Sequence, residues 1–341
     1  MGLFDFFSSD LAIDLGTANT LIIQKDKVVV DEPSIIALDR QNGKVIAVGN
    51  KAMQMHEKTH ENIRTIRPLR DGVIADFHAA EQMIRGMIRM INQGKRFFTP
   101  SHRMVICIPS GITEVEKRAV RDSAEHAGAK EVYMIPEPIA AAIGIGINIE
   151  QPVGSMIVDI GGGTTEIAVI ALSGIVGDQS IRTAGDVFTR DILDYMRRQH
   201  NLLIGERSAE KIKVEVGSAL TELEEEIEPF EVRGRDLMTG IPKVITVTYS
   251  EVAYAIDKSI SKIEEAVLRA LETAPPELSA DIYDRGIHLT GGGALLRGLD
   301  KRLSIKTKLP VHVADDPLRA VVRGTGQALK DLDDYKAVLM T

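Results

Sequence analysis

The chain has 341 residues, which at about 150 residues per domain predicts two domains with buried cores of their own. Hydrophobic residues make up 44% of the chain and charged residues 26%, a composition that excludes collagen-like, low-complexity and largely disordered classes. The 41 basic and 49 acidic residues leave a net charge of −8, so the basic excess of a general DNA- or RNA-binding protein is absent and we expect no nucleic-acid partner.

The N-terminal segment 1–9 carries four large apolar side chains, Leu3, Phe4, Phe6 and Phe7. No basic region precedes them and no run of 18 apolar residues occurs, so the sequence predicts neither a secretory signal nor a membrane-spanning helix. Two interpretations stay open for these side chains: they contact a membrane, or they pack on the protein itself. The single cysteine, Cys107, lies in an apolar strand pattern that favours a core position over a nucleophile, and a reducing cytoplasm fits.

The first predicted element is a strand over 11–15, followed by the small-residue turn Gly16-Thr17-Ala18 and a second strand. A hairpin of the same design recurs over 156–170, around Gly161-Gly162-Gly163-Thr164. An aspartate precedes each turn, Asp14 in the first hairpin and Asp159 in the second. A repeat at this scale predicts two similar α/β halves, 1–150 and 151–341.

A helix and a strand are predicted between the two hairpins. Thr113 and Glu116 form a capping box that begins a helix, and a strand follows over 132–135. Next comes Pro136-Glu137-Pro138, which predicts Glu137 as the N-cap of a connecting helix over 137–147. Strands that alternate with helices, beside antiparallel hairpins, indicate mixed α/β sheets.

The second half adds a predicted helix over 206–217 that is capped by Ser208. Helical spacing puts Glu210 and Lys213 on one face of it, where a flat base could lie, and Ile212 on the face that points to a core. The alternative for Glu210 and Lys213 is an ordinary surface ion pair. A later strand over 287–290 enters a third glycine turn, 291–293.

Small-residue turns allow backbone N–H groups to approach a phosphate closely. Two such turns can clamp one polyphosphate, and Asp14 and Asp159 could hold Mg²⁺ through its waters. One glycine turn alone is typical of a plain tight hairpin, whereas two matched turns and a third favour a phosphate site. No Gly-x-x-x-x-Gly-Lys-Ser/Thr loop occurs, which excludes a P-loop, and the histidines show no zinc-ligand spacing.

Three motifs resemble the phosphate-1, phosphate-2 and adenosine motifs of the actin superfamily, which includes sugar kinases and heat-shock chaperones. They are Ile13-Asp14-Leu15-Gly16-Thr17, Asp159-Ile160-Gly161-Gly162-Gly163-Thr164 and Leu289-Thr290-Gly291-Gly292-Gly293-Ala294. Within the superfamily, segments 14–20, 67–77, 136–144 and 289–299 are similar to the MreB family, the bacterial actins of rod-shaped cells. The resemblance covers nearly the whole chain.

This resemblance implies an actin-like ATPase fold, in which two RNase H-like α/β domains face a cleft that binds ATP and Mg²⁺. The implied phosphate contacts are Thr17, Ala18, Asn19, Gly162, Gly163 and Thr164. The implied nucleoside contacts are Glu210, Lys211, Ile212, Lys213, Gly293, Ala294, Leu295 and Leu296. Asp14 and Asp159 would hold the metal through water, and Glu137 would position the attacking water with Thr164 beside it.

The family further implies slow ATP hydrolysis coupled to assembly into paired protofilaments. These would lie on the inner face of the cytoplasmic membrane, organise cell-wall elongation proteins and maintain rod shape. Leu3, Phe4, Phe6 and Phe7, or Phe97 and Phe98, are the candidates for membrane contact. Asp5 interrupts the first set and no lysine precedes Asp10, so we expect apolar insertion rather than electrostatic attraction.

An ATP-dependent small-molecule kinase of the same superfamily is the alternative function. A kinase needs a carboxylate base and a sugar pocket, and the sequence shows no insert that would form one. A chaperone would need a peptide-binding domain after the ATPase, and only a short segment follows Gly326. The sequence therefore favours a filament-forming ATPase.

Overall fold

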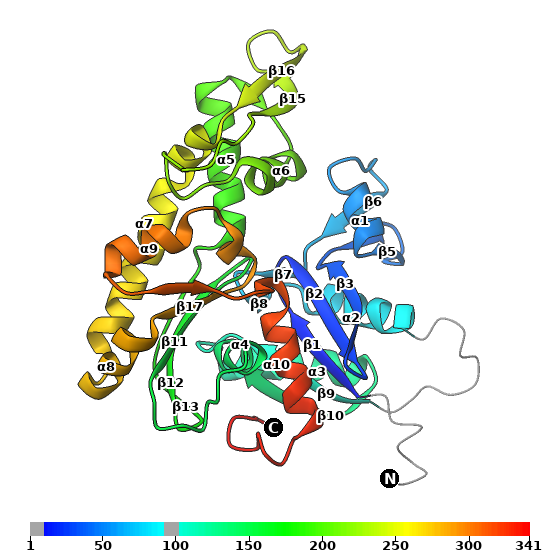
Figure 1. Cartoon of the computed structure of the whole chain (residues 1–341). Coiled ribbons are helices and arrows are strands. Elements are labelled where there is room, and N and C mark those ends of the chain that lie inside the picture. The colour runs from blue at the N-terminus through cyan, green and yellow to red at the C-terminus, as the bar shows by residue number, and fades with distance from the viewer. Residues whose placement is uncertain (1–9, 92–101) are drawn as a thin grey trace.

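The structure of the chain is a computed structural model that describes residues 10–91 and 102–341 (Figure 1). The segment 1–9 and the Phe97-Phe98 pair, both candidates for membrane contact, lie outside the described residues. Within the described ranges, no helix combines the length and the apolar character needed to cross a membrane.

Two five-stranded sheets form the centre of the molecule and share one topology. The order is β3-β2-β1-β9-β10 in the first sheet and β13-β12-β11-β17-β18 in the second. In the first sheet β1, β2 and β3 pair antiparallel, while β1, β9 and β10 pair parallel. In the second sheet β11, β12 and β13 pair antiparallel, while β11, β17 and β18 pair parallel. The first sheet consists of β1 (Leu11–Leu15), β2 (Asn19–Gln24), β3 (Lys27–Pro33), β9 (His102–Ile108) and β10 (Ala129–Pro136). The second consists of β11 (Ser155–Ile160), β12 (Thr165–Ala171), β13 (Gly174–Ile181), β17 (Ile287–Thr290) and β18 (Val311–Val313). Both predicted hairpins and the mixed sheets are confirmed.

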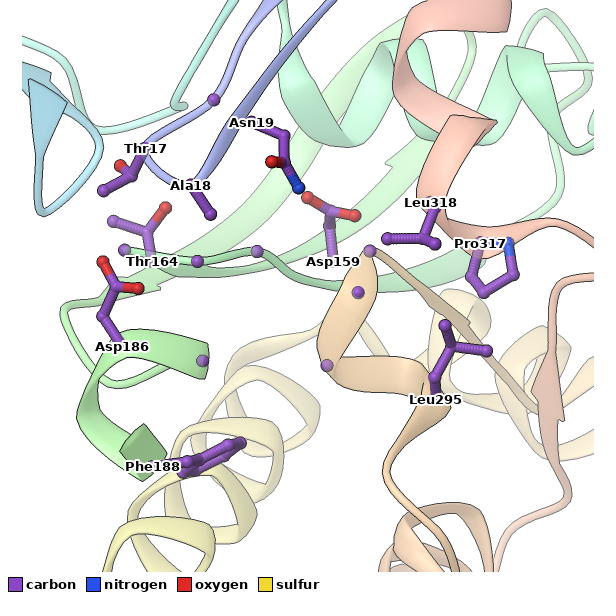
Figure 2. A pocket seen from close by; sticks show the side chains of 18 of the residues that line it. Thr17, Ala18, Asn19, Asp159, Thr164, Asp186, Phe188, Leu295, Pro317 and Leu318 are labelled. Atoms are coloured by element: carbon purple, nitrogen blue, oxygen red, sulfur yellow. The ribbon is translucent and has the colours of Figure 1, made fainter. Parts of the chain in front are cut away.

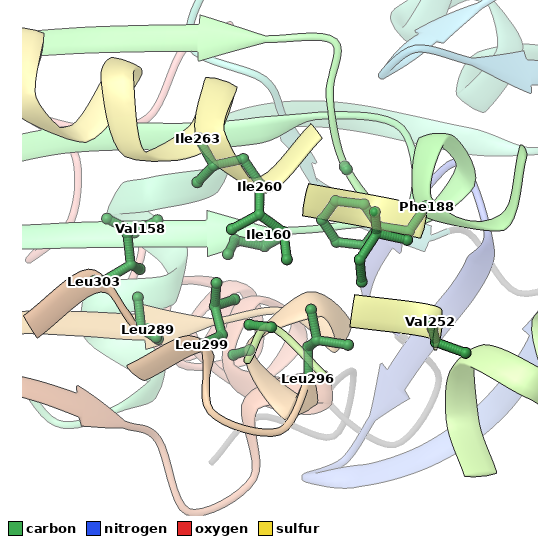
Figure 3. Packing of buried hydrophobic residues seen from close by; sticks show 14 of the residues in the cluster. Val158, Ile160, Phe188, Val252, Ile260, Ile263, Leu289, Leu296, Leu299 and Leu303 are labelled. Carbon is green, nitrogen blue, oxygen red and sulfur yellow. The ribbon is translucent and has the colours of Figure 1, made fainter. Parts of the chain in front are cut away.

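Helices cover the outer faces of the two sheets and fill the space between them. Between the sheets lie α4 (Glu137–Gly144) and α10 (Ala320–Lys330), in a core that draws apolar side chains from both sheets. The first sheet is covered outside by α2 (Phe77–Ile91) and α3 (Glu114–His126). The second is covered by α5 (Gly185–Gln199), α7 (Tyr249–Thr273) and α9 (Leu299–Thr307), whose side chains pack on Val158, Ile160 and Leu289 (Figure 3).

Smaller elements extend beyond each sheet, toward the same end of the molecule in Figure 1. On the first side these are β4 (Ile36–Asp39), β5 (Val45–Val48), α1 (Asn50–Met55) and β6 (Ile63–Ile66). On the second side these are β14 (Leu202–Leu203), α6 (Glu206–Val216), β15 (Phe230–Asp236) and β16 (Pro242–Val247). The remaining elements are β7 (Leu69–Arg70), β8 (Val73–Ile74), α8 (Pro276–Arg285), and the 3₁₀ helices η1 (Gly292–Leu295) and η2 (Pro317–Arg319).

The two helices between the sheets cross in direct backbone contact. A Cβ atom on Gly144 would lie 1.8 Å from the carbonyl oxygen of Ala320, and one on Gly324 would lie 1.8 Å from that of Ala140. Only glycine permits this approach. Although α10 follows the second sheet in the chain, it also packs on β1, β2 and β9 of the first. The C-terminal segment therefore returns to the first half, and the boundary at 150/151 stays a prediction.

Three local predictions differ from the structure. The connecting helix ends at Gly144 instead of residue 147, because Gly146 adopts a left-handed φ of 84° that a helix cannot continue through. Glu137 is the first helical residue, and the extended Pro136 is the N-cap. Ser208 is not a cap either, since α6 begins after Gly205. The capping box of Thr113 and Glu116 and the buried strand position of Cys107 are confirmed.

Candidate functional site

A cavity of about 570 Å³ lies between the two halves of the molecule, within the range of small-molecule sites. Its walls come from the β1–β2 turn, the β11–β12 turn, the start of α5, one face of α6, the loop with η1 and the start of α10. Figure 2 shows a polar end, with Thr17, Thr164 and Asp186, and an apolar end, with Leu295, Pro317 and Leu318. The cavity is thus divided in the way that a molecule with one charged and one flat apolar end requires.

The two small-residue turns contact each other at the polar end. A Cβ atom on Gly162 would lie 2.6 Å from the Cβ of Ala18, and one on Gly163 would lie 2.5 Å from Thr17 Oγ1. The backbone N–H of Gly72 donates a hydrogen bond to Thr17 Oγ1 over 3.0 Å. The glycines of the second turn therefore make room for the side chains of the first.

Hydrogen bonds from neighbouring segments to the carbonyl oxygens of each turn fix its conformation. Ser34 Oγ donates to the carbonyl oxygen of Gly16 over 2.6 Å, and the Ser34 N–H donates to that of Ala18 over 2.9 Å. The N–H groups of Gly185 and Asp186, at the start of α5, donate to the carbonyl oxygens of Gly161 and Gly162. Because these contacts use the carbonyl groups, they fix both turns without using their N–H groups.

Two aspartates line the cavity, Asp14 near the end of β1 and Asp159 near the end of β11. Burial raises the pKa of Asp14 to about 6, while a hydrogen bond from Cys107 Sγ, 3.1 Å from Asp14 Oδ1, opposes the shift. Burial raises the pKa of Asp159 to about 7, opposed by the Thr290 hydroxyl, which donates to Asp159 Oδ1 over 2.7 Å. The charge of Asp14 adds to the rise at Asp159. Burial makes it costly for both carboxyl groups to carry a negative charge, and a bound cation would lower that cost. The pair therefore fits a cation site.

A third carboxylate, Glu137, borders the cavity from the first turn of α4. Burial raises the pKa of Glu137 well above its ordinary value, and the charges of Glu166, Asp159 and Asp14 add to the shift. Glu166 itself is held by Ser180 Oγ over 2.6 Å and by the Ser110 N–H over 3.3 Å. Within the part of the chain that the structure describes, no group donates to the Glu137 carboxyl group, which lines the cavity and can meet a small molecule there.

One face of α6 lines the cavity. Lys213 Nζ lies 2.7 Å from Glu210 Oε2 and donates to the carbonyl oxygen of Gly185 over 3.0 Å. Thr189 Oγ1 donates to Glu210 Oε2 over 2.6 Å. This network orients Glu210 and Lys213, which a plain surface pair would leave mobile.

Most of the predicted site residues line this one cavity, and three do not. Those that line it are Asp14, Thr17, Ala18, Asn19, Glu137, Asp159, Gly162, Gly163, Thr164, Glu210, Lys213, Gly293, Leu295 and Leu296. The other three are Lys211, which faces solvent, and Ile212 and Ala294, which are buried in the core of the second half. On a helix, residues one and two positions from Glu210 point away from its face, which is why Lys211 and Ile212 do not line the cavity although Glu210 and Lys213 do.

Several lining residues were not predicted, among them Arg67, Asp186, Glu206, Pro317 and Leu318. Burial raises the pKa of Asp186, and the charges of Arg67 and Lys213 oppose the shift. The sequence does carry a signal for Asp186, since it lies in the first turn of an amphipathic helix, where acidic residues are enriched. No local signal marks Arg67 or Glu206, because what brings them to the cavity is the approach of the two halves.

Comparison with known proteins gives one consistent result. The chain matches the MreB/Mbl protein family over residues 8–337. The cell shape-determining protein MreB of Escherichia coli (strain K12) is 50% identical over 332 residues, which cover 96% of this chain and 95% of that protein. The cell shape-determining protein Mbl of Bacillus subtilis (strain 168) is 50% identical over 328 residues, 96% of this chain and 97% of that protein.

Among solved structures, MreB 5 of Spiroplasma citri bound to AMPPNP superposes with a TM-score of 0.89 at 38% sequence identity. The superposition covers 96% of this chain and 97% of that chain. The actin-like fold expected from the motifs is therefore confirmed. The match of sequence and of fold extends over nearly all of the chain. The chain therefore belongs to the MreB/Mbl family of actin-like, cell shape-determining proteins.

Proposed function

We propose that the chain binds ATP with Mg²⁺ in the cavity, hydrolyses it slowly, and couples this cycle to assembly into filaments that organise cell-wall synthesis and maintain rod shape. The observation that carries the proposal is the convergence of both small-residue turns and the carboxyl groups of Asp14, Glu137 and Asp159 on one cavity. The relative from S. citri was solved with AMPPNP, an ATP analogue, in the same fold. The cell shape-determining relatives support the role in shape.

The two ends of the cavity suit the two ends of ATP. Backbone N–H groups of the two turns would donate to the polyphosphate, since the neighbouring elements that hold the turns bind their carbonyl groups. The Gly161 N–H is not part of this set, because it donates to the carbonyl oxygen of Thr164 over 2.9 Å. The nucleoside would lie in the part of the cavity that α6 and the loop of η1 line. Gly217 and Leu296 close the far side of that space, because a Cβ on Gly217 would lie 3.0 Å from Leu296 Cδ1.

The carboxylates of Asp14 and Asp159 fit Mg²⁺, which prefers oxygen ligands and keeps several waters. When bound, the ion would supply charge neutralisation on the phosphates. We propose that Glu137 accepts a hydrogen bond from the attacking water and orients it, with Thr164 beside it on the cavity wall. Its raised pKa makes Glu137 a better proton acceptor than an exposed glutamate.

Sedimentation and phosphate release, with and without Mg²⁺-ATP, test the proposal. We expect the protein to pellet with ATP and to release phosphate slowly, whereas Asp159→Ala does neither. A screen of sugars for ATP-dependent phosphorylation tests the kinase alternative. Sugar phosphorylation without assembly would contradict the proposal, and so would assembly and hydrolysis that Asp159→Ala leaves unchanged.

We further propose that the filaments bind the inner face of the cytoplasmic membrane through Leu3, Phe4, Phe6 and Phe7, or through Phe97 and Phe98. Burying such side chains yields about 25 cal/mol per Å², too little for firm attachment of one subunit, but a filament repeats the anchor. Assembled protein should therefore float with liposomes while monomers do not. Flotation of wild type, of a chain lacking residues 2–9 and of Phe97→Ala/Phe98→Ala identifies the anchor, and equal flotation of all three would rule out both.

A further inference from the structure

The cleft between the two halves is bridged at one edge by a cluster that none of the steps above uses. Helix α6 begins at Glu206 after Gly205, which has no side chain to cap it. The missing cap comes from the other half of the molecule, because the Glu206 N–H donates to Glu57 Oε1 over 3.0 Å. The fit is close: a Cβ on Gly205 would lie 2.3 Å from Glu57 Oε2.

A second set of contacts runs beside the first. Arg67 Nη2 lies 2.9 Å from Glu206 Oε1, and His56 Nε2 lies 3.3 Å from Glu206 Oε2. The His56 ring is itself held by Thr65, whose Oγ1 is 2.8 Å from Nδ1. All the residues that contact the start of α6 here belong to the first half: His56, Glu57 and Arg67 bind Glu206 directly, and Thr65 holds the His56 ring. The start of α6 is therefore bound from across the cleft.

The backbone of Glu57 adopts a conformation that costs energy. Its φ is +60°, in the left-handed region that side chains other than glycine rarely adopt. The same geometry presents the Glu57 carboxylate to the N-terminus of α6, where a negative charge is stabilised by the free N–H groups and the helix dipole. The hydrogen bond from the Glu206 N–H to the Glu57 carboxylate therefore offsets the backbone strain at Glu57, which a glycine at this position would not have.

The cluster is connected to the cavity through Arg67 and Glu206, both of which line it. Arg67 is also the main charge that opposes the raised pKa of Asp186 at the polar end. The same helix, α6, carries Glu210 and Lys213 on the cavity wall. Separation of Glu57 and Arg67 from α6 would therefore open the cavity and release its wall together.

A bound cation is the other reading of this cluster, because one ligand atom each from His56, Glu57 and Glu206 lies within 4.8 Å of the others. The electrostatics argue against it. The Arg67 guanidinium already neutralises Glu206, and a helix N–H already occupies Glu57. A second positive charge at this place would be repelled by Arg67.

We propose that Glu57, His56 and Arg67 form a latch with the start of α6, and that this latch must open before a nucleotide leaves the cavity. The inference rests on the proposed nucleotide binding. Since one helix cap and one partly exposed ion pair hold the latch, its loss should speed release by about 3- to 10-fold and leave the cavity itself intact.

Glu57→Gly is the variant that separates the latch from a purely structural role. It removes the carboxylate and also relieves the left-handed strain, so the thermal unfolding temperature should stay the same or rise. Release of the fluorescent analogue mant-ATP with Mg²⁺, chased with excess ATP at protein concentrations below assembly, should be about 3- to 10-fold faster than in wild type. Glu61→Gly, which removes an exposed carboxylate of the same segment, is the matched control and should release at the wild-type rate.

Hydrogen exchange of the Glu206 amide in nucleotide-free protein tests the contact without any nucleotide. We expect faster exchange in Glu57→Gly than in wild type and in Glu61→Gly. Release and exchange at wild-type rates in Glu57→Gly would overturn the latch. If wild type does not bind mant-ATP, the proposed function is refuted. In that case an exchange rate of the Glu206 amide that is the same in Glu57→Gly as in wild type would show that the contact between Glu57 and α6 does not exist.

Discussion

The two hairpins that face the cavity have the same topology and different turns. The β1–β2 turn presents the side chains of Thr17 and Ala18, while the β11–β12 turn presents almost none, because a Cβ on Gly162 or Gly163 would collide with them. The glycine content of the second turn is therefore set by the first turn as well as by any ligand. When two copies of a motif must pack on each other, their side chains have to differ so that one copy makes room for the other.

The corners beyond the two sheets also correspond in position and differ in chemistry. After β10 the chain enters α4 through Glu137, whereas after β18 it enters α10 through Pro317 and Leu318. One corner brings a carboxyl group to the cavity and the other brings apolar side chains. The divergence of these two equivalent corners therefore adds to the difference between polar and apolar walls of the cavity.

The largest expected effect concerns the contact that joins the two halves. Gly324→Ala would place a methyl group 1.8 Å from the carbonyl oxygen of Ala140, so α10 must move away from α4. We expect a loss of about 3 kcal/mol or more in the free energy of unfolding, or failure to fold. Gly326→Ala in the same helix is the control: its Cβ would lie 3.4 Å from Ile23, an ordinary contact, and alanine favours a helix. Denaturant unfolding measures both, and equal stabilities would disprove the contact.

The next effect tests the difference between the two corners. If Glu137 only orients water, Glu137→Ala should still bind ATP and assemble while phosphate release slows by about 10²-fold. A stopped-flow phosphate assay beside sedimentation measures this. Leu318→Ala, at the equivalent corner of the second half, should instead weaken ATP binding and leave the rate of the bound state nearly unchanged. A large loss of ATP affinity in Glu137→Ala would mean that Glu137 serves the structure of the corner.

The third prediction moves one methyl group from the first turn to the second. Gly162→Ala should lower the affinity for Mg²⁺-ATP by about 10-fold, because its Cβ would lie 2.6 Å from the Cβ of Ala18 and push the turns apart. In the double variant Gly162→Ala/Ala18→Gly that collision is gone, and the closest remaining contact is 3.1 Å, to the backbone nitrogen of residue 18. Most of the affinity should return, as titration with mant-ATP would detect. A double variant as weak as Gly162→Ala would mean that the ligand alone requires the glycine.

Much of this site was predictable because its signals are local. Asp14, Asp159 and the small-residue turns occur where a strand ends, and alternation and turn chemistry reveal such places in a sequence. The helix over 206–216 was predictable for the same reason. Its cap was not, because Ser208 looked like the usual signal while the actual cap, Glu57, lies about 150 positions away in the chain.

Residues that depend on the approach of the two halves had no local signal. Arg67 and Glu206 meet across the cleft, and each alone is an unremarkable charged residue. Gly144 and Gly324 would count as weak helix positions by propensity, and only the crossing of α4 and α10 explains them. A pattern within one segment predicts that segment, and contacts between distant segments require the assembled fold.

The smallest effect distinguishes the two aspartates by pH, in protein free of metal and nucleotide. Because folding raises the pKa of Asp159 to about 7 and that of Asp14 to about 6, the folded state holds protons that the unfolded state has released above about pH 4. Folding stability should therefore fall as pH rises, from pH 4 to 7 for Asp159 and from pH 4 to 6 for Asp14. Asp159→Asn should raise the free energy of unfolding at pH 7.5 by about 1 kcal/mol, and Asp14→Asn by less, with the pH dependence flattened over the matching range. Equal gains, or none, in denaturant unfolding at pH 5 and 7.5 would show that folding does not raise the pKa of Asp159 above that of Asp14.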